Sequence, residues 1–514
     1  MRVPISDTPR LIYEINTRVW LSDLSRQYGA NIDLNSVPPT EWDTIAQYGF
    51  HAVWLMGVWE RSPAGIAISN QNVALLNEFR RTLADFEIED NAGSPYCVLQ
   101  YVVDPQFGGP AALASARGEL ARRGVKLLLD FVPNHVAPDN PWVTDHPEYF
   151  FRRGDHTLPE DSECYTTARG DSFACGRDPN FPPWSDVVQL NGLHAGVRIA
   201  MLDTLLAIAS QCDGVRCDMA VLLIHEVFAA TWNVPADQIP KTEYWMDLIQ
   251  QVKVAYPSFI FIAEAYWGRE RELQGQGFDL CYDKLLYDHL RDGNISAIGS
   301  HFSTDVAYQR KLVRFTENHD ELRSSSALPP AKLEAGAVIA ATLPGAVLFH
   351  EGQLEGRRTR VPVFLRRRPE EAVDLGRRTF YKALLVAVCH PVFSRGDWTF
   401  CRTDGWPDNQ SAENLAAWLW DDGMERRLIV VNLSERYAQG QVRLPWQDPT
   451  DTQYHFVDPI AGVDLVRNAE TIMGPGLYVE LAAWKFHFFE VHRLYREASG
   501  HGDLHLHDGV RTIR

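Results

Sequence analysis

Four short segments of the chain place polar and charged residues directly after apolar runs. They read Asp130-Phe-Val-Pro-Asn-His135, Gly214-Val-Arg-Cys-Asp218, Phe259-Ile-Phe-Ile-Ala-Glu264 and Phe315-Thr-Glu-Asn-His-Asp320. Side chains of these types can transfer protons, attack as nucleophiles or bind hydroxyl groups. Each segment alone is also explained as the polar end of a strand. The interpretation therefore depends on whether the fold brings the four segments together.

Arg216 and Asp218 lie two positions apart in a segment expected to be a strand. Because residues i and i+2 of a strand face the same side, these side chains point together, and Cys217 points away into ordinary packing. A guanidinium beside Asp218 keeps that carboxylate ionised, as a carboxylate nucleophile requires. The alternative is a purely structural Arg–Asp pair.

Glu264 closes an apolar strand and is followed by Tyr266 and Trp267. A carboxyl group against aromatic surface loses solvation, so its pKa rises and it can hold a proton near neutral pH. The alternative is an ordinary polar strand terminus.

The fourth segment adds His319 and Asp320, while Glu317 within it is better explained as a salt-bridge partner than as a catalyst. One carboxylate would then have a cationic partner and another would have aromatic neighbours. This division of environments is typical of a catalytic pair with separate acid and base roles. Two carboxyl groups about 5 Å apart would hydrolyse glycosides with retention of configuration.

The elements that must position these groups alternate short apolar runs with helical patterns, such as residues 109–123. Strands that alternate with helices indicate βαβ units and a parallel sheet, which is an α/β fold class. Eight such units favour a (β/α)8 TIM barrel, in which catalytic groups lie at the C-terminal ends of the strands. The expected strands are residues 11–15, 51–55, 125–132, 214–217, 259–263, 280–282, 312–315 and 346–349.

The pattern also predicts how the chain divides into domains. Residues 1–135 and 194–409 are expected to form the catalytic barrel. Residues 136–193 lack periodicity and are rich in Pro, Asp and aromatic residues, so we expect a functional, loop-rich domain inserted after strand 3. Strand-like runs between turn residues predict a small C-terminal antiparallel β domain over 410–495. Residues 496–514 are polar and are expected to form a flexible tail.

The composition excludes several classes of protein. The chain has 514 residues, with 49 Lys and Arg against 67 Asp and Glu, and a net charge of −18. This balance argues against nucleic acid and anionic membranes as partners. No apolar run is long enough to span a membrane, and the N-terminus carries no apolar signal segment. We therefore expect a cytoplasmic protein, and leave its oligomeric state open.

The four segments, in this order and on strands 3, 4, 5 and 7, resemble the signature regions of the α-amylase family of glycoside hydrolases. The resemblance covers most of the chain. It implies a (β/α)8 barrel with an insert after strand 3 and a C-terminal β-sandwich. It also implies a retaining enzyme that acts on carbohydrate substrates, α-glucosides, through a glycosyl-enzyme intermediate. Asp218 would be the nucleophile, Glu264 the general acid and then base, and Asp320 would bind sugar hydroxyls and stabilise the transition state.

The resemblance further implies a set of substrate-binding residues. Arg216 would hold Asp218 with help from Asp130, and two histidines would hydrogen-bond hydroxyl groups of the sugar in the cleaved position. Residues 94–96 resemble the segment whose Tyr stacks on that sugar, and residues 186–191 resemble a fifth, weaker family segment. The substrate-binding candidates are Arg216, His135, His319, Tyr96, Asp130 and Asn134. Aromatic side chains that could pack on sugar rings are Trp54, Trp59, Trp142, Trp184, Tyr266 and Trp267; each alone is better explained as core, but some of the group are expected to line the site.

The chain departs from the family pattern after the nucleophile. Many members carry Lys-His three and four positions later, for substrate and calcium contacts, where this chain has Val221 and Leu222. Because Asn134 alone cannot fix a calcium ion, we expect no obligatory metal and no other cofactor.

A second departure is a cluster of arginines after the last barrel strand. Six of the twelve residues from 357 to 368 are Arg in an otherwise acidic protein: Arg357, Arg358, Arg360, Arg366, Arg367 and Arg368. They indicate either a salt-bridged loop or an anion site for a phosphorylated or acidic acceptor. The second interpretation would make the protein a phosphorylase-like enzyme that transfers a glycosyl unit to phosphate or a sugar phosphate. A non-catalytic carbohydrate-binding relative is disfavoured, because all three family carboxylates are present.

Overall fold

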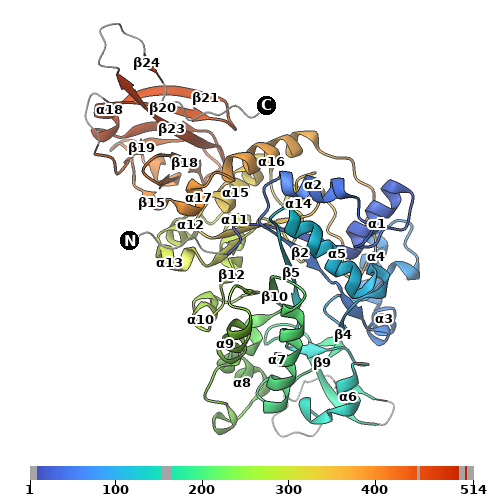
Figure 1. The fold of residues 1–514 in the computed structure, drawn as a ribbon. Coiled ribbons are helices and arrows are strands. Elements are labelled where there is room, and N and C mark those ends of the chain that lie inside the picture. The colour runs from blue at the N-terminus through green and yellow to red at the C-terminus, as the bar shows by residue number, and fades with distance from the viewer. Residues whose placement is uncertain (1–7, 153–163, 168–169, 448–451, 497–503, 506–514) are drawn as a thin grey trace.

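The computed structural model describes residues 8–152, 164–167, 170–447, 452–496 and 504–505 (Figure 1). At its centre lies a closed barrel of eight parallel strands, which confirms the α/β fold class and the TIM barrel. Every expected strand is present, and no boundary differs from the expected one by more than one residue. The barrel strands are β1 (Leu11–Asn16), β2 (Ala52–Met56), β5 (Lys126–Phe131), β10 (Gly214–Cys217), β11 (Ile260–Ala263), β12 (Leu280–Tyr282), β13 (Leu312–Arg314) and β14 (Ala346–His350).

Apolar side chains from alternate strand positions fill the interior of the barrel, as the two-residue period of a strand requires. Ile12, Leu128 and Leu348 belong to this interior core and are at most 2% exposed. Gly214 begins β10 where packing leaves no room, because a Cβ atom there would lie 2.6 Å from the carbonyl oxygen of Ile260. The polar groups of the candidate site lie beyond this apolar core, at the C-terminal ends of the strands.

Helices surround the barrel and follow its strands (Figure 1). Asn16, the last residue of β1, caps the helix that follows, since its side chain accepts a hydrogen bond from the N–H of Val19. Asp374 caps α16 in the same way through the N–H of Arg377. The helices of the barrel and its loops are α1 (Thr17–Tyr28), α2 (Pro39–Gln47), α3 (Pro63–Ser69), α4 (Val73–Thr82), α5 (Gly109–Arg122), α7 (Ala195–Ala209), α8 (His225–Trp232), α9 (Tyr244–Ala255), α10 (Glu270–Gly275), α11 (Lys284–Asp292), α12 (Ile295–Phe302), α13 (Val306–Gln309), α14 (Ser324–Ala327), α15 (Pro330–Thr342), α16 (Leu375–Val388) and α17 (Val392–Arg395).

An excursion between β2 and α5 was not expected as a separate feature. It contains α3, α4 and the hairpin of β3 (Trp59–Arg61) with β4 (Val98–Val103). Phe79 and Leu83 from α4 pack against Leu365 in a small apolar cluster of their own. The Arg-rich segment after β14 is thereby attached to the excursion after β2.

The insert after β5 forms a four-stranded sheet in the order β6-β9-β8-β7. Figure 1 shows it on the side of the barrel away from the C-terminal sheets. Its fold is only partly described, because residues 153–163 and 168–169 fall outside the described residues. Its elements are β6 (His135–Val136), α6 (Pro141–Asp145), β7 (Cys164–Thr166), β8 (Ser172–Gly176) and β9 (Trp184–Gln189).

Two antiparallel sheets follow the barrel, one with seven strands and one with three, and pack over a shared apolar core. The larger sheet begins with residues 397–401, ahead of residue 410. Of the expected tail after residue 495, only Arg496, Leu504 and His505 are described. The elements are β15 (Asp397–Cys401), β16 (Thr403–Asp404), β17 (Leu415–Asp421), β18 (Arg426–Asn432), β19 (Ala438–Val442), β20 (Gln453–Asp458), β21 (Val463–Asn468), α18 (Ala469–Met473), β22 (Leu477–Leu481), β23 (Phe486–Arg496) and β24 (Leu504–His505).

The C-terminal sheets are joined to the barrel by buried tryptophans. Trp418 packs edge-on against Phe302 of α12, and the indole N–H of Trp420 donates to the carbonyl of Thr342 at 2.7 Å. Among the helices of the described residues, none is long and apolar enough to cross a membrane.

Candidate active site

The strands β5, β10 and β11 are neighbours in the barrel, and their register brings the predicted groups level with one another. Arg216 on β10 is paired with Asp130 on β5, and Cys217 is paired with Ala263 on β11. Asp218 and Glu264 are therefore the next residues of adjacent strands. The two carboxylates that the sequence selected lie side by side at the mouth of the barrel.

Arg216 joins these two carboxylates. Its Nη1 lies 2.5 Å from Oδ1 of Asp218, and its Nη2 lies 2.6 Å from Oε1 of Glu264. The guanidinium is 1% exposed and faces the rings of Trp54, Tyr96 and Tyr282, which stabilise a cation through their π faces. The expected Arg216–Asp218 pair is present, and the same cation also holds the expected acid.

The surroundings of Asp218 set its ionisation by two opposed effects. Burial raises the pKa of its carboxyl group, and the Arg216 guanidinium opposes that rise. The next residue, Met219, has a φ of 43°, a left-handed conformation that a long side chain rarely adopts. This turn aims the N–H of Met219 at Oε2 of Glu264, 2.5 Å away.

Glu264 is 2% exposed, and burial raises its pKa to about 7. The hydroxyl of Tyr266 donates to its Oε1 at 2.9 Å. The sequence predicted a carboxyl group with a raised pKa beside aromatic side chains, and the structure has this arrangement. Trp267 lies beyond Tyr266 with a φ of 58° and is 44% exposed.

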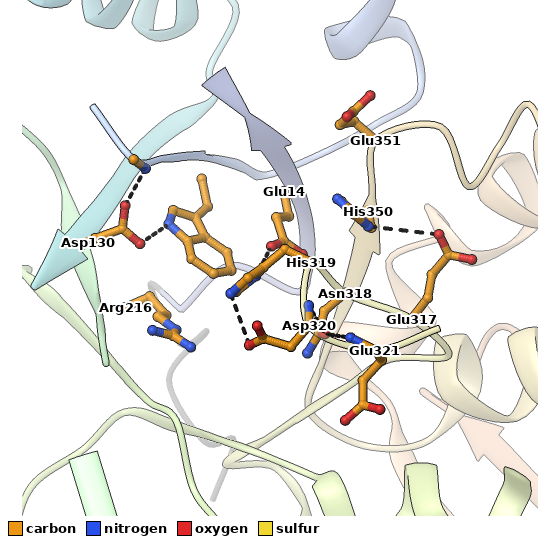
Figure 2. A network of polar contacts seen from close by, with 12 residues as sticks. Glu14, Asp130, Arg216, Glu317, Asn318, His319, Asp320, Glu321, His350 and Glu351 are labelled. Atoms are coloured by element: carbon orange, nitrogen blue, oxygen red, sulfur yellow. Dashed lines mark hydrogen bonds and ion pairs between the residues drawn. The ribbon is translucent and has the colours of Figure 1, made fainter. Parts of the chain in front are cut away.

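The end of β13 supplies a third carboxylate, held by a histidine (Figure 2). Nε2 of His319 lies 3.0 Å from Oδ2 of Asp320 and 2.7 Å from the hydroxyl of Tyr96, and its Nδ1 lies 2.5 Å from Oε1 of Glu14. Burial alone would lower the pKa of His319, but the carboxylates of Asp320 and Glu14 raise it to about 10. Asp320 is only partly buried, which alone would raise its pKa somewhat, and His319 brings that pKa down to about 2.

Asp130 is buried and faces β2 rather than Arg216. Its carboxylate accepts hydrogen bonds from the indole N–H of Trp54 at 3.0 Å and from the N–H of Gly57 at 2.6 Å (Figure 2). Burial raises its pKa to about 6. Asp130 thus fixes Trp54, whose ring faces both Arg216 and His319. Its expected role toward the substrate stays a prediction.

Known proteins resemble this chain in sequence and in fold. An α-amylase, MalA, of Haloarcula japonica is 27% identical over 254 residues, which are 46% of this chain and 33% of that protein. An intracellular maltogenic amylase of Bacillus subtilis is 22% identical over 44% of this chain and 37% of its own length. The α-amylase of Geobacillus thermoleovorans, solved with acarbose, superposes with a TM-score of 0.66 at 18% identity and covers 95% of this chain and 99% of its own. The chain therefore resembles members of the α-amylase family of glycoside hydrolases in sequence over about half of its length, and it shares the fold of solved α-amylases.

Two further findings limit what this resemblance shows. The chain spans about one third of the length of the relatives it matches in sequence. A comparison with models of known protein families found no match. Among the sequence relatives is an alpha-1,4-glucan:maltose-1-phosphate maltosyltransferase of Rhodospirillum rubrum, 27% identical over 51% of this chain and 35% of that protein.

Two candidates of the family pattern, Asn134 and His135, lie where the chain passes from barrel strand β5 into the insert. The amide of Asn134 exchanges hydrogen bonds with the side chain of Gln189 on β9, at 3.0 and 3.2 Å. The ring of His135 packs beside Trp184, and burial lowers its pKa to about 4, so it is neutral at pH 7. Both residues connect the barrel with the insert, and their contact with substrate stays a prediction.

The aromatic candidates separate into two groups. Trp54, Tyr266 and Trp267 lie at the candidate site. Trp59 is 1% exposed and donates its indole N–H to the carbonyl of Asp130, so its ring belongs to the core. Trp142 is partly buried and packs edge-on against Tyr149.

Where many family members have Lys-His, this chain has an apolar turn. Val221 and Leu222 lie in η4 (Ala220–Leu223), at 0% and 3% exposure, within the main apolar core. They offer no polar group to a substrate or metal. Among the described residues, no cluster of three or more His, Cys, Asp and Glu side chains could hold a metal ion.

The arginines after β14 are mostly paired with carboxylates. Arg366 and Arg367 bind Asp90, and Arg367 also binds Asp85. Arg368 binds Asp23 and Glu351, and Arg360 binds Glu78 of α4. Four of the six arginines thus form the salt-bridged loop that was one of the two interpretations of the sequence.

The structure adds a residue that the sequence interpretation missed. Glu14 on β1 is 0% exposed and holds His319 from the side opposite Asp320. The signal was present, because Leu11-Ile-Tyr-Glu-Ile-Asn16 is an apolar strand with one carboxylate near its end, as at Glu264. Its partner lies 305 residues away, so the sequence alone could not pair them.

Proposed function

We propose that the protein is an α-retaining glycoside hydrolase or transglycosidase that acts on α-glucosides by double displacement. The observation that carries this proposal is one buried guanidinium that binds two carboxylates at the ends of adjacent strands. One of them, Glu264, has a pKa of about 7 and can carry a proton at neutral pH. The other, Asp218, is held in its ionised form by Arg216.

In the first displacement, a carboxylate oxygen of Asp218 attacks the anomeric carbon and the glycosidic C–O bond breaks. Glu264 gives its proton to the leaving oxygen, and a β-glycosyl ester of Asp218 forms. The N–H of Met219 and the hydroxyl of Tyr266 orient the carboxyl group of Glu264 for this transfer.

In the second displacement, Glu264 is ionised and removes a proton from water or from an acceptor hydroxyl. The oxygen so activated attacks the anomeric carbon, the ester bond breaks, and Asp218 is recovered as a carboxylate. Two inversions at one carbon give a product of the original α configuration. Whether water or a sugar attacks decides between hydrolysis and transfer.

Both displacements pass through a transition state with positive charge on the sugar ring. Carboxylates fixed before the reaction stabilise that charge without reorganising. Asp320, held by the same histidine nitrogen that contacts the hydroxyl of Tyr96, has the charge for this role and for binding sugar hydroxyls. We assign Arg216, His319, Tyr96, Asp130, His135 and Asn134 as the groups that bind substrate or hold those that do.

The proposal is tested by the anomeric configuration of the first product and by replacement of the nucleophile. Proton NMR during cleavage of 4-nitrophenyl α-glucoside or maltose should show the α anomer first, before mutarotation. Asp218→Ala should lose turnover by about four orders of magnitude, and added azide should restore release of nitrophenol and give a β-glycosyl azide. A β anomer from the wild type, or turnover unchanged in Asp218→Ala, would reject the assignment.

A second candidate is glycosyl transfer to phosphate or a sugar phosphate. The similarity to a protein of Rhodospirillum rubrum named alpha-1,4-glucan:maltose-1-phosphate maltosyltransferase favours it. The ion pairs of Arg360, Arg366, Arg367 and Arg368 oppose it, because paired guanidinium groups leave little free positive charge for an anion. Inorganic phosphate would divert the product from free sugar to sugar 1-phosphate if this candidate were correct, and phosphate without effect on the product would exclude it.

We further propose that the protein acts in the cytoplasm, because it is similar in sequence to a Bacillus subtilis protein named intracellular maltogenic amylase. Its partner is a carbohydrate, and the negative balance of the chain disfavours nucleic acid and anionic membranes.

A further inference from the structure

Glu14 is a buried carboxylate with one contact that matters for the candidate site. It lies at the C-terminal end of β1, beside Trp54 of β2 and His350 of β14 in the register of the barrel. Its Oε1 is 2.5 Å from Nδ1 of His319 (Figure 2). Its Oε2 is buried and has no hydrogen-bond partner among the described residues. A buried carboxylate oxygen without a donor is costly, which points to a use other than stability.

The histidine that Glu14 binds is fully engaged at its other nitrogen. Nε2 faces Oδ2 of Asp320 at 3.0 Å and the hydroxyl of Tyr96 at 2.7 Å. With a carboxylate at each nitrogen, both ring N–H groups can donate only in the imidazolium form. The other charged or titratable groups that act on the ring are Asp130, Asp218 and His350.

We propose that Glu14 is a positioning residue of this active site: it keeps His319 as an imidazolium whose Nε2–H holds Asp320 in place. The proposal rests on the function proposed above, since it concerns how Asp320 is presented to the sugar. Asp320 is the most exposed of the three carboxylates, with 46% of its side chain accessible, so packing alone does not fix it. The charged Nε2–H of His319, with Nε2 3.0 Å from Oδ2 of Asp320, holds that carboxylate in place.

Two substitutions of Glu14 distinguish the effect of its negative charge from the effect of its side-chain length. Glu14→Gln keeps the length of the side chain and an oxygen that accepts from Nδ1–H, but removes the negative charge. The imidazolium then loses one of its two carboxylates, so the titration midpoint of His319 falls by about 1 to 2 pH units. Glu14→Asp keeps the charge and moves it one methylene away, so the midpoint should fall less.

The matched control is Glu317→Gln. Glu317 is also buried at 0% exposure at the same end of the barrel, but it accepts hydrogen bonds from Arg323 at 2.8 Å and from Ser324, not from His319. The two variants thus remove the same charge from equally buried positions, and only one of them touches the histidine.

The titration is followed by NMR on protein labelled at the histidine Cε1 carbon, with the His319 signal identified by its loss in His319→Asn. We expect the wild type and Glu317→Gln to keep His319 as imidazolium to about pH 9, while Glu14→Gln titrates 1 to 2 pH units lower. On 4-nitrophenyl α-glucoside at pH 9, where the lower midpoint leaves much of His319 neutral, kcat relative to the wild type should fall about twofold to tenfold in Glu14→Gln and less in Glu14→Asp.

A neutral His319 at pH 7 in the wild type overturns the proposal, and so does a midpoint unchanged by Glu14→Gln. Loss of kcat in Glu14→Gln no greater than in Glu317→Gln also overturns it. If Glu14→Gln does not fold, a midpoint in Glu14→Asp equal to that of the wild type, with unchanged kcat, serves as the same refutation. A wild type that cleaves no glycoside refutes the proposed function instead, and the NMR titration still reports whether Glu14 sets the charge of His319.

Discussion

Arg216→Lys is the substitution whose consequences follow most directly from the geometry. Arg216 binds Asp218 through one terminal nitrogen and Glu264 through the other, at 2.5 and 2.6 Å. Lysine keeps the positive charge but is a single point donor and cannot reproduce the fork. In the variant, either Asp218 or Glu264 loses its ion pair or both ion pairs weaken, while the two carboxylates stay buried.

The sign of the effect is the same for both carboxylates. Burial raises the pKa of Asp218 and of Glu264, and Arg216 lowers both. A weaker cation therefore lets each pKa rise, by about 1 to 2 pH units for the loss of a close ion pair. The activity needs Asp218 ionised and Glu264 protonated, so both limbs of the pH profile of kcat/KM move to higher pH. On the acid limb, at a pH well below the pKa of Asp218, each pH unit of this rise lowers the ionised fraction of Asp218 by about tenfold, and kcat/KM falls with it.

The assay is kcat/KM for 4-nitrophenyl α-glucoside from pH 4 to 10, with Arg314→Lys as the control. Arg314 is equally buried at 1% exposure, but it lies next to Asp283 and bonds Gln309, away from the catalytic carboxylates. Its variant should lose stability and keep the wild-type pH profile. Limbs that stay in place in Arg216→Lys, or move to lower pH, would refute the reasoning.

Three further predictions concern single contacts. Tyr266→Phe removes a donor to the ionised form of Glu264, so the alkaline limb of kcat/KM should move up by as much as about one pH unit; an unmoved limb contradicts the role of that hydroxyl. Trp267→Ala removes an exposed ring beside the acid, and KM for maltooligosaccharides should rise about threefold to tenfold, the value of one aromatic contact, with kcat nearly unchanged; an unchanged KM means the ring faces no sugar. Asp90→Asn removes the carboxylate shared by Arg366 and Arg367, which leaves Arg367 only its pair with Asp85, and it should lower Tm by a few degrees at pH 7. Because Arg367 lowers the pKa of Asp90 against the effect of its burial, that stability is lost as the pH falls through the folded pKa, so the Tm values of the two proteins should converge as the pH falls below that pKa.

The local part of this architecture could be predicted from the sequence. The apolar strands and their alternation with helices predicted all eight barrel strands, and the two-residue period placed Arg216 and Asp218 on one face. Such local patterns could not predict contacts between segments that are distant in sequence. The second partner of Arg216 depends on the register of β10 with β11, and the partner of His319 lies 305 residues earlier.

The arginines after β14 illustrate the same limit. Their charge was obvious in the sequence, but the carboxylates that neutralise Arg367 and Arg368 come from residues 23, 85, 90 and 351. The excursion after β2 supplies Asp85 and Asp90. It is held in place by the packing of Phe79 and Leu83 against Leu365, which lies 282 residues after Leu83.

The charges within the site, rather than the −18 of the whole chain, explain how a cationic transition state could be stabilised. With the general acid protonated, the polar layer holds the carboxylates of Glu14, Asp130, Asp218 and Asp320 against the cations of Arg216 and His319. Negative charge is therefore in excess in a layer where all of these groups except Asp320 are buried, and electrostatic interactions between buried groups are strong. A sugar that develops positive charge reduces this excess. Glu14 contributes one of the unbalanced negative charges without a proposed contact to substrate, because His319 balances Asp320 and Arg216 balances Asp218. Replacing Glu14 by a neutral residue would therefore weaken the binding of the transition state more than that of the uncharged substrate, and the loss should appear in kcat and leave KM nearly unchanged.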